Sequence, residues 1–259
     1  MSATKLRIHK NSNSSIDAVV ETFVRVKVAD DFKITCQETF LEDVKILKPI
    51  ADVTVPDPHE ILPHSPKQKI VVGISGVSCG GKTTVASGLN DWLNKSEQNA
   101  ELVMQDNFYK PADELPINSI TNFPEFDEPE SVRMDLIKDK IIEWLEDPVE
   151  VDENDTKILI VEGTMIFTDP EICRLCDLRY LVHVDFEVAK YRRSLRNYKI
   201  PDPPQIVARN IWPKYIKHRE VFRQLMVKYG FMCKQINGTI PVEQTIAGIL
   251  LDVKVNEHR

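Results

Sequence analysis

The sequence lacks any apolar run that approaches the roughly 18 to 20 residues needed to span a bilayer. Its N-terminal region also lacks the hydrophobic core of a secretory signal. An excess of basic residues is missing as well, since the formal net charge is −7, and no basic stripe is interleaved with aromatic residues. We therefore expect neither a membrane partner nor a nucleic-acid partner.

Cysteines are few and odd in number, with five at scattered positions: Cys36, Cys79, Cys173, Cys176 and Cys233. Such a set argues against a disulfide framework and favours a reducing compartment. We expect a cytoplasmic protein, although residues 1–16 are Ser-rich, basic and free of acids, which leaves a transit peptide open. Cys173 and Cys176 form a Cys-x-x-Cys with no second pair at zinc-site spacing, so we interpret them as packing residues in a short helix.

Glycine is absent from residues 1–68, and this segment ends in a cluster of prolines at positions 56, 58, 63 and 66. Such an exit is typical of a linker. We therefore divide the chain into an N-terminal extension of unknown structure, 1–68, and one folded domain, 69–259. Within the extension, only the alternation at 22–29 predicts a strand, and we assign the extension no function.

The segment Lys69–Thr84, KIVVGISGVSCGGKTT, places Gly-x-x-x-x-Gly-Lys-Thr between an apolar run and a helix-forming sequence. Its glycines let the backbone curl so that successive N–H groups point at one anion, and the helix N-terminus adds its positive end. Lys82 is expected to reach the outer phosphates, and the Thr83 hydroxyl to ligate Mg²⁺. The motif therefore predicts a phosphate-binding loop for a nucleoside triphosphate.

Strands and helices alternate after this loop. The pattern predicts strands at 69–74, 101–105, 157–161, 179–184 and 232–236, and helices at 82–95, 131–146, 187–198, 205–229 and 242–253. The runs KILIV and YLVHV are typical of strands buried on both faces of a parallel sheet. We predict an α/β fold of the P-loop NTPase type, with three layers and a helical lid, whose ligands lie beyond the carboxyl ends of the strands.

Carboxylates follow two of these strands. Asp106, after ELVMQ, could take the proton of a substrate hydroxyl and influence Mg²⁺, or it could be a turn residue. Glu162, after KILIV, is placed to hold Mg²⁺ or its waters opposite Thr83, with a helix-capping acid as the alternative. Asp127 precedes Pro129, which by itself predicts a helix N-cap.

Basic residues are concentrated in Lys190–Lys234, which has 12 Lys and Arg against 2 Asp and Glu. The first three arginines, Arg192, Arg193 and Arg196, have helical spacing, so Arg192 and Arg196 would share a face. Such a cluster can neutralise a transferring phosphoryl group or can merely solvate a helix. Both interpretations stay open from the residues alone.

Together, GISGVSCGGKTT, VMQDNFYKP, FDEPESV, LIVEG, YRRSLRNY, PDPP and IWPKY resemble the nicotinamide riboside kinases, a branch related to the uridine kinases. The resemblance covers about Lys69 to Asp252 and none of the first 68 residues. It implies transfer of the ATP γ-phosphate to the 5′-hydroxyl of nicotinamide riboside, giving the mononucleotide for NAD synthesis. Nicotinic acid riboside is implied as a second substrate.

On the matching positions the resemblance implies overlapping sets of site residues. Asp106 would be the general base, with Lys82 and Arg192 as further catalytic residues, and Mg²⁺ would lie on Thr83, Asp106 and Glu162. ATP would contact the loop and the lid: Gly76, Val77, Ser78, Cys79, Gly80, Gly81, Lys82, Thr83, Thr84, Arg192 and Arg196. The substrate would contact Asp106, Asn107, Phe108, Tyr109, Phe126, Asp127, Arg193, Tyr198 and Lys199, with Asp127 on the ribose hydroxyls.

Phe126 and Tyr198 match an aromatic pair that would sandwich the nicotinamide ring. The physical reason is independent of the resemblance, because a pyridinium riboside is cationic and favours aromatic faces. Two positions depart from the family pattern: Asn107 stands where a second Asp is common, and Phe126 stands where Tyr is common. One negative charge and one hydroxyl contact are therefore missing.

Three alternatives remain beside this interpretation. A uridine or cytidine kinase, or another small-hydroxyl kinase, would use the same loop, base and lid. A GTP-dependent switch protein is disfavoured because its Asn-Lys-x-Asp is absent, the nearest string being NKSE at 94–97. A non-catalytic nucleotide-binding interaction protein is disfavoured because Lys82, Thr83, Asp106 and Glu162 are all present.

Overall fold

The computed structural model describes residues 69–96, 99–148, 156–198, 200–203 and 205–257. These residues belong to one compact unit, Pro63–Arg259. The predicted N-terminal extension, its strand at 22–29 and its proline-rich linker lie outside the described residues, as do Cys36 and Lys199.

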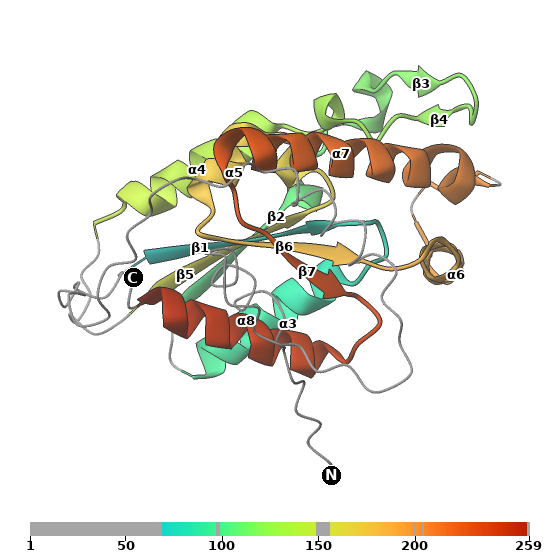
Figure 1. The fold of residues 1–259 in the computed structure, drawn as a ribbon. Helices are drawn as coiled ribbons and strands as arrows, with labels where there is room; N and C mark the ends of the chain where they lie inside the picture. Colours follow the sequence, from blue (N-terminus) through green and yellow to red (C-terminus); the bar gives the residue numbers. More distant parts are fainter. Residues whose placement is uncertain (1–68, 97–98, 149–155, 199, 204, 258–259) are drawn as a thin grey trace, which may run out of the picture. The chain divides into compact units, whose positions relative to one another are not determined.

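Five parallel strands form the central sheet, in the order β2-β5-β1-β6-β7 (Figure 1). Their bounds are β1 Lys69–Gly76, β2 Ala100–Met104, β5 Lys157–Gly163, β6 Leu178–His183 and β7 Lys234–Asn237. In the register, Glu162 of β5 lies beside Ile74 of β1 and Met104 of β2. The carboxyl ends of these three strands therefore meet at one edge of the sheet.

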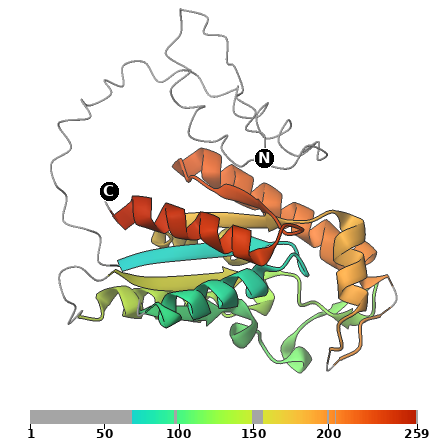
Figure 2. The same cartoon turned by 90° about the horizontal axis from the view of Figure 1, so that it is seen from below.

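Helices cover both faces of the sheet (Figures 1 and 2). One layer holds α3 (Lys82–Lys95) and α8 (Val242–Glu257), and the other holds α4 (Met134–Glu146), α5 (Pro170–Leu175) and α7 (Trp212–Tyr229). A further helix, α6 (Phe186–Ser194), lies beyond the carboxyl end of β6. The three-layer α/β fold predicted from the sequence is confirmed. In the described ranges, no helix combines the length and apolarity that a membrane span requires.

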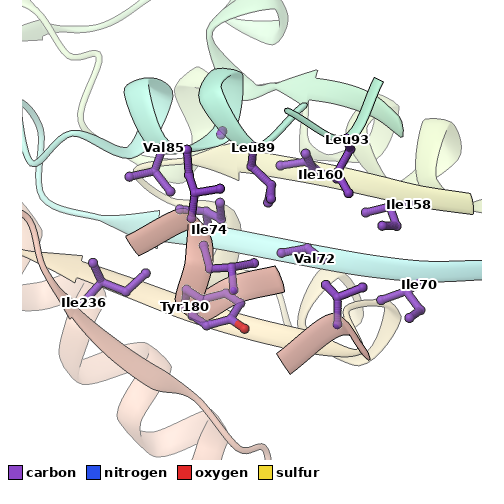
Figure 3. Close-up of a cluster of buried hydrophobic side chains, with 14 of the residues drawn as sticks. Ile70, Val72, Ile74, Val85, Leu89, Leu93, Ile158, Ile160, Tyr180 and Ile236 are labelled. Carbon is purple, nitrogen blue, oxygen red and sulfur yellow. The ribbon is translucent and has the colours of Figure 1, made fainter. Parts of the chain in front are cut away.

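The core explains why these strands read as continuous apolar runs. Ile70, Val72 and Ile74 of β1 pack toward α3 and α8, and Figure 3 shows this cluster. Val71, between them, points to the other layer and packs with side chains of α4, α5 and α7. Because successive side chains of a strand alternate between faces, a strand covered on both faces must be apolar throughout.

Short elements carry the chain between these layers. They are the 3₁₀ turns η1 Gln105–Phe108, η2 Ala112–Glu114, η3 Pro129–Ser131 and η4 Ile166–Thr168, and the small hairpin β3 Ile117–Asn118 with β4 Phe123–Pro124. The hairpin, which the sequence did not reveal, lies near the amino-terminal end of α7 (Figure 1). Cys173 lies in α5 and Cys176 directly follows it, both buried, as predicted.

Two predicted helices differ from the structure. The helix expected at 187–198 ends at Ser194, so Arg196 lies beyond it and does not share a helical face with Arg192. The helix expected at 205–229 opens with a π-helical turn, η5 (Val207–Ile211), before α7. Pro213 has no N–H to donate to the carbonyl four residues earlier, so a regular α-helical ladder cannot form there.

Candidate active site at the carboxyl ends of the strands

The predicted phosphate-binding loop connects β1 to α3. Gly76 has φ 139°, and a Cβ there would lie 2.0 Å from the carbonyl oxygen of Val182, so the strand can end only on glycine. Gly81 adopts φ 103° immediately before α3, and Gly80 donates its N–H to Val77 O at 3.0 Å. Cys79 adopts φ 60° without being glycine. The loop therefore curls back on itself at the amino-terminal end of α3, where backbone N–H groups favour an anion.

Lys82, Thr83 and Glu162 form the polar centre of this loop. Lys82 is buried and donates to Val77 O at 3.0 Å, and Thr83 donates to Glu162 Oε1 at 3.2 Å. Burial lowers the pKa of Lys82 and raises that of Glu162, while the attraction between the two charges opposes both shifts. Glu162 thus lies opposite Thr83, as the sequence suggested.

Asp106 lies next to this centre but not on a strand. β2 ends at Met104, and Asp106 is an exposed residue of the 3₁₀ turn η1. Its charge acts on both Lys82 and Glu162, which places its carboxylate near the loop. The turn is anchored by Gln105, a fully buried side chain that accepts from Met165 N at 2.9 Å and donates to Thr164 Oγ1 at 3.2 Å.

These oxygen donors suit Mg²⁺, which prefers hard oxygen ligands and usually binds one or two carboxylates together with phosphates. The Thr83 hydroxyl and the Glu162 carboxylate lie within hydrogen-bond distance of each other, and the charge of Asp106 acts on Glu162. Across the described ranges, no group of three or more His, Cys, Asp or Glu forms a metal cage of its own.

An aromatic and acidic wall, formed by Tyr109, Phe123, Phe126 and Asp127, continues the site beyond η1. Phe126 contacts Tyr109 edge-on and Phe123 at a tilt, each with ring centroids 5.8 Å apart. Burial raises the pKa of Tyr109, and the charges of Asp127 and Asp106 raise it further. Gln105 donates to the Tyr109 hydroxyl at 3.1 Å, so this wall is joined to η1, the turn that carries Asp106.

Asp127 lies in this wall and does not cap a helix. Glu128 occupies the position before η3, with no capping bond from its side chain, so the N-cap interpretation of Asp127 was wrong. The Oδ2 atom of Asp127 instead accepts a hydrogen bond from Asn210 Nδ2 at 2.9 Å. Burial raises the pKa of Asp127 to about 6, although the positive charge of Arg193 lowers it. This pKa lies only about one unit below neutral pH, so Asp127 is ionised there but gains a proton on mild acidification.

Two arginines of α6 bind the phosphate loop. Arg192 donates to the carbonyl oxygens of Cys79 and Gly80, each at 3.3 Å, and to that of Gly238 at 3.0 Å. Arg193 donates to Ser78 Oγ at 3.2 Å and pairs with Asp202. The lid arginines are thereby joined to the loop through its backbone and through Ser78.

Tyr198 lies against the same arginines. The guanidinium carbon of Arg193 is 4.0 Å from the centre of the Tyr198 ring, so a cation covers one face of that ring. Arg196, beyond α6, interacts with the Tyr198 hydroxyl. Stacking of a ligand ring on Tyr198 would therefore use the face that Arg193 does not cover.

The other predicted contact residues are spread around the loop and η1. Val77 is buried and packs with Val184 and Ala189, so its side chain anchors the loop to the residues that follow β6. Thr84 and Asn107 are exposed, and Phe108 is partly buried against the core. Lys199 is not described.

Sequence reasoning missed Gly238, Asn210, Asp202 and Gln105. A Cβ on Gly238 would lie 2.1 Å from Gly80 O, so this glycine lets the β7–α8 connection approach the loop. Asn210 and Asp202 hold the side chains of Asp127 and Arg193. Of these, only Gly238 and Asp202 carried a signal in the sequence: a lone glycine after a strand, and an acid enclosed by prolines.

The chain is similar in sequence to several kinases. The chain matches no protein-family model. It is 32% identical over 196 residues to nicotinamide riboside kinase 2 of Homo sapiens, covering 72% of this chain and 81% of that protein. It is 30% identical over 196 residues to nicotinamide riboside kinase of Saccharomyces cerevisiae, covering 60% and 80%. A uridine kinase of Bacillus cereus is 24% identical over 213 residues, covering 72% and 97%.

Proposed function

Because the chain belongs to the nicotinamide riboside kinase family, we propose that it transfers the γ-phosphate of ATP to the 5′-hydroxyl of nicotinamide riboside. The product would be nicotinamide mononucleotide, a precursor of NAD. Nicotinic acid riboside is a second substrate of the same shape. ATP is the phosphoryl donor, and Mg²⁺ accompanies it. The cysteines are odd in number and scattered, which favours the cytoplasm.

One observation carries the proposal: the turn η1, which bears Asp106, is joined to the aromatic wall, because Gln105 donates to the Tyr109 hydroxyl at 3.1 Å and Tyr109 packs against Phe126. A kinase needs its acceptor hydroxyl in line with the phosphoryl group, since alignment supplies much of the rate. Asp127 would bind the ribose hydroxyls there, and Asp106 would face the 5′-hydroxyl.

On the donor side, the loop N–H groups and Lys82 would bind the phosphates of ATP. The Lys82 ammonium donates to the loop carbonyl of Val77, a contact that it would exchange for phosphate oxygens. Thr83, Asp106 and Glu162 would hold Mg²⁺, which when bound neutralises charge on the phosphates. Arg192 and Arg196 would add positive charge from the lid.

On the acceptor side, Asp106 would take the proton of the 5′-hydroxyl late in the transfer. Its exposed position on η1, beside the buried Lys82 and Glu162, leaves the carboxylate open to a ligand. Phe126 and Tyr198 would flank the cationic nicotinamide ring, and the nearby acids favour its charge. Closure of the lid would exclude water, which competes as an acceptor.

The test is phosphorylation of nicotinamide riboside and of uridine, measured side by side with ATP, Mg²⁺ and purified protein. We expect kcat/KM to favour nicotinamide riboside strongly, and Asp106→Asn to lower turnover by roughly 100-fold or more. A preference for uridine would contradict the proposed substrate and would favour a pyrimidine nucleoside kinase, in line with the uridine kinase relative. Turnover of neither nucleoside would contradict the proposed activity.

A further inference from the structure

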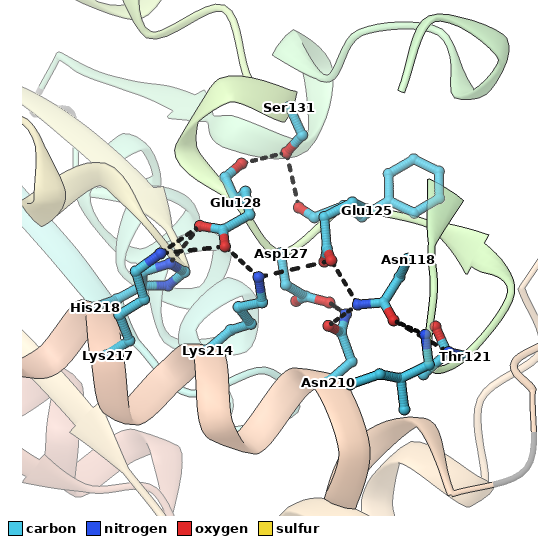
Figure 4. Close-up of polar contacts among 12 residues, drawn as sticks. Asn118, Thr121, Glu125, Asp127, Glu128, Ser131, Asn210, Lys214, Lys217 and His218 are labelled. Atoms are coloured by element: carbon cyan, nitrogen blue, oxygen red, sulfur yellow. Dashed lines mark hydrogen bonds and ion pairs between the residues drawn. The ribbon is translucent and has the colours of Figure 1, made fainter. Parts of the chain in front are cut away.

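We propose that Asn210 is a positioning residue, which fixes the Asp127 carboxylate as an acceptor for the ribose hydroxyls. It does so as part of an amide relay, the chain of hydrogen bonds that runs from Asn118 through Asn210 to Asp127. The inference rests on the proposed function, in which Asp127 binds the riboside. Figure 4 shows the relay between the hairpin, the Asp127 loop and the start of α7.

The orientation of the first amide is set by backbone groups. Asn118 Oδ1 accepts from the N–H of Ile120 at 2.9 Å and of Thr121 at 3.1 Å. Because a backbone N–H can only donate, this side of the amide must be its carbonyl oxygen. The Nδ2 group of Asn118 consequently points the other way, to Glu125 Oε2 at 2.6 Å and to Asn210 Oδ1 at 3.1 Å.

The second amide follows from the first. Since Asn118 presents a donor, Asn210 must present its Oδ1, and its Nδ2 is then directed at Asp127 Oδ2 at 2.9 Å. A flip of the Asn210 amide would set oxygen against the Asp127 carboxylate and nitrogen against the Asn118 donor. The relay therefore gives Asp127 a fixed donor on Oδ2, and Oδ1 would accept from the ligand hydroxyls.

The backbone that carries Asn210 is itself unusual. Asn210 is 2% exposed and belongs to the π-helical turn η5, directly before α7. π-Helical turns are rare and are frequent at functional sites. A buried amide in such a turn destabilises the fold unless its hydrogen bonds are made, and here the bonds end on the substrate-facing carboxylate.

Three charged groups act on Asp127, from α6, from α7 and from its own loop. Arg193 of α6 and Lys214 of α7 favour its ionised form, while Glu125 of the same loop disfavours it. The Tyr109 hydroxyl also lies within electrostatic reach. Burial raises the pKa of Asp127 to about 6, and the Asn210 bond opposes that rise. Removal of the donor would therefore leave Asp127 partly protonated near neutrality.

The sharpest variant is Asn210→Asp, because it keeps the shape and the acceptor for Asn118 but sets a carboxylate against Asp127. Two adjacent carboxylates ionise together only at higher pH, and at lower pH they share one proton, which restores a donor to Asp127. Ser131→Ala is the matched control. Ser131 is equally buried and donates to Phe126 O at 2.8 Å and Glu128 O at 2.6 Å, so it braces the same loop without touching Asp127.

In steady-state kinetics, we expect the wild-type KM for nicotinamide riboside to rise as pH falls below about 6. For Asn210→Asp we expect the opposite trend: KM raised about tenfold at pH 8, recovering as pH falls toward 6.5, with kcat and the KM for ATP changed less than about threefold. A pH profile parallel to the wild type, or the same inversion in Ser131→Ala, would overturn the inference.

A second measurement does not depend on the substrate. The carboxyl carbon of Asp127 can be titrated by ¹³C NMR in the full-length protein, assigned by its loss in Asp127→Asn. We expect Asn210→Ala to raise the pKa of Asp127 clearly, and an unchanged titration would overturn the positioning role. A raised pKa together with no phosphorylation of nicotinamide riboside by the wild type would instead contradict the proposed function alone.

Discussion

Arg193 pairs with Asp202 through two hydrogen bonds, from Nε to Oδ2 at 2.6 Å and from Nη2 to Oδ1 at 2.8 Å. This bidentate pair holds the guanidinium plane over the Tyr198 ring, 4.0 Å from its centre. Prolines flank Asp202 on both sides and restrict its backbone. The Pro-rich segment after α6 therefore fixes an arginine that we propose to touch the substrate.

Asp202→Ala should free Arg193 and weaken riboside binding. We expect the KM for nicotinamide riboside to rise about tenfold, the loss of one charge-assisted contact, with a smaller change in the KM for ATP. Steady-state kinetics in both substrates measure this. Glu187→Gln is the control, because Glu187 pairs only loosely with Lys190, at 3.4 Å on the exposed face of α6. Equal effects of the two variants would count against the role of Asp202.

Asp106→Asn should leave ATP binding nearly intact and lower turnover by roughly 100-fold or more, the usual scale of acid–base catalysis. The reason is that the amide keeps the shape of η1 but cannot take the proton of the 5′-hydroxyl. ATP binding by calorimetry and kcat with nicotinamide riboside separate the two effects. Asp113→Asn, which changes another exposed acid of the same region, should retain full turnover. Near-normal turnover of Asp106→Asn would refute its assignment as the base.

The sequence predicted the layers and the donor side of the site because their signals are local. The phosphate loop is one contiguous motif, α3 was predicted with its observed bounds, and Glu162 closes an apolar run. Apolar periodicity alone identifies strands that are buried on both faces. The relative placement of Thr83 and Glu162 then followed from the parallel order of the strands.

The acceptor side could not be predicted in the same way. Asn118 and Asn210 are 92 positions apart, and nothing in the local pattern distinguishes either from a surface amide. The π-helical turn depends on Pro213, further along the chain, which periodicity does not register. The N-cap interpretation of Asp127 failed because a distant amide binds this carboxylate, a tertiary contact that overrides the local one.

Gly238→Ala should loosen the phosphate loop from a distance. The added methyl would lie 2.1 Å from Gly80 O, so either the loop or the β7–α8 connection must shift, at a cost of about 1–3 kcal/mol. The Arg192 bond to Gly238 O would be displaced as well. We expect the KM for ATP to rise about tenfold while the KM for nicotinamide riboside changes little.

The same substitution at another glycine gives the control. Gly248 lies in α8, and a Cβ there meets nothing within 4 Å. Gly248→Ala should therefore raise the free energy of unfolding by about 0.5–1 kcal/mol, through helix propensity alone, and leave both KM values unchanged. An unaltered KM for ATP in Gly238→Ala would show that the close approach of the two backbones does not shape the nucleotide site.

Asp127→Asn should stabilise the protein while it weakens the riboside site. The pKa of Asp127 is about 6 in the folded protein, against 3.8 for the ordinary carboxyl, so its ionised form is disfavoured by folding. The resulting loss of stability is complete above pH 6, shrinks between pH 6 and pH 4, and vanishes below. The shift corresponds to about 3 kcal/mol as an upper bound at pH 7.5, and to roughly half of that at pH 5.

Urea unfolding of wild type and Asp127→Asn at pH 7.5 and pH 5 measures this difference, with Asp91→Asn on the exposed face of α3 as control. We expect the variant to gain stability at pH 7.5, to lose about half of that gain at pH 5, and to show a raised KM for nicotinamide riboside at both. A gain that did not depend on pH would trace the stabilisation to packing instead of charge. The binding site accepts this loss of stability because its carboxylate must stay ionised to accept hydrogen bonds from the hydroxyls of the ligand.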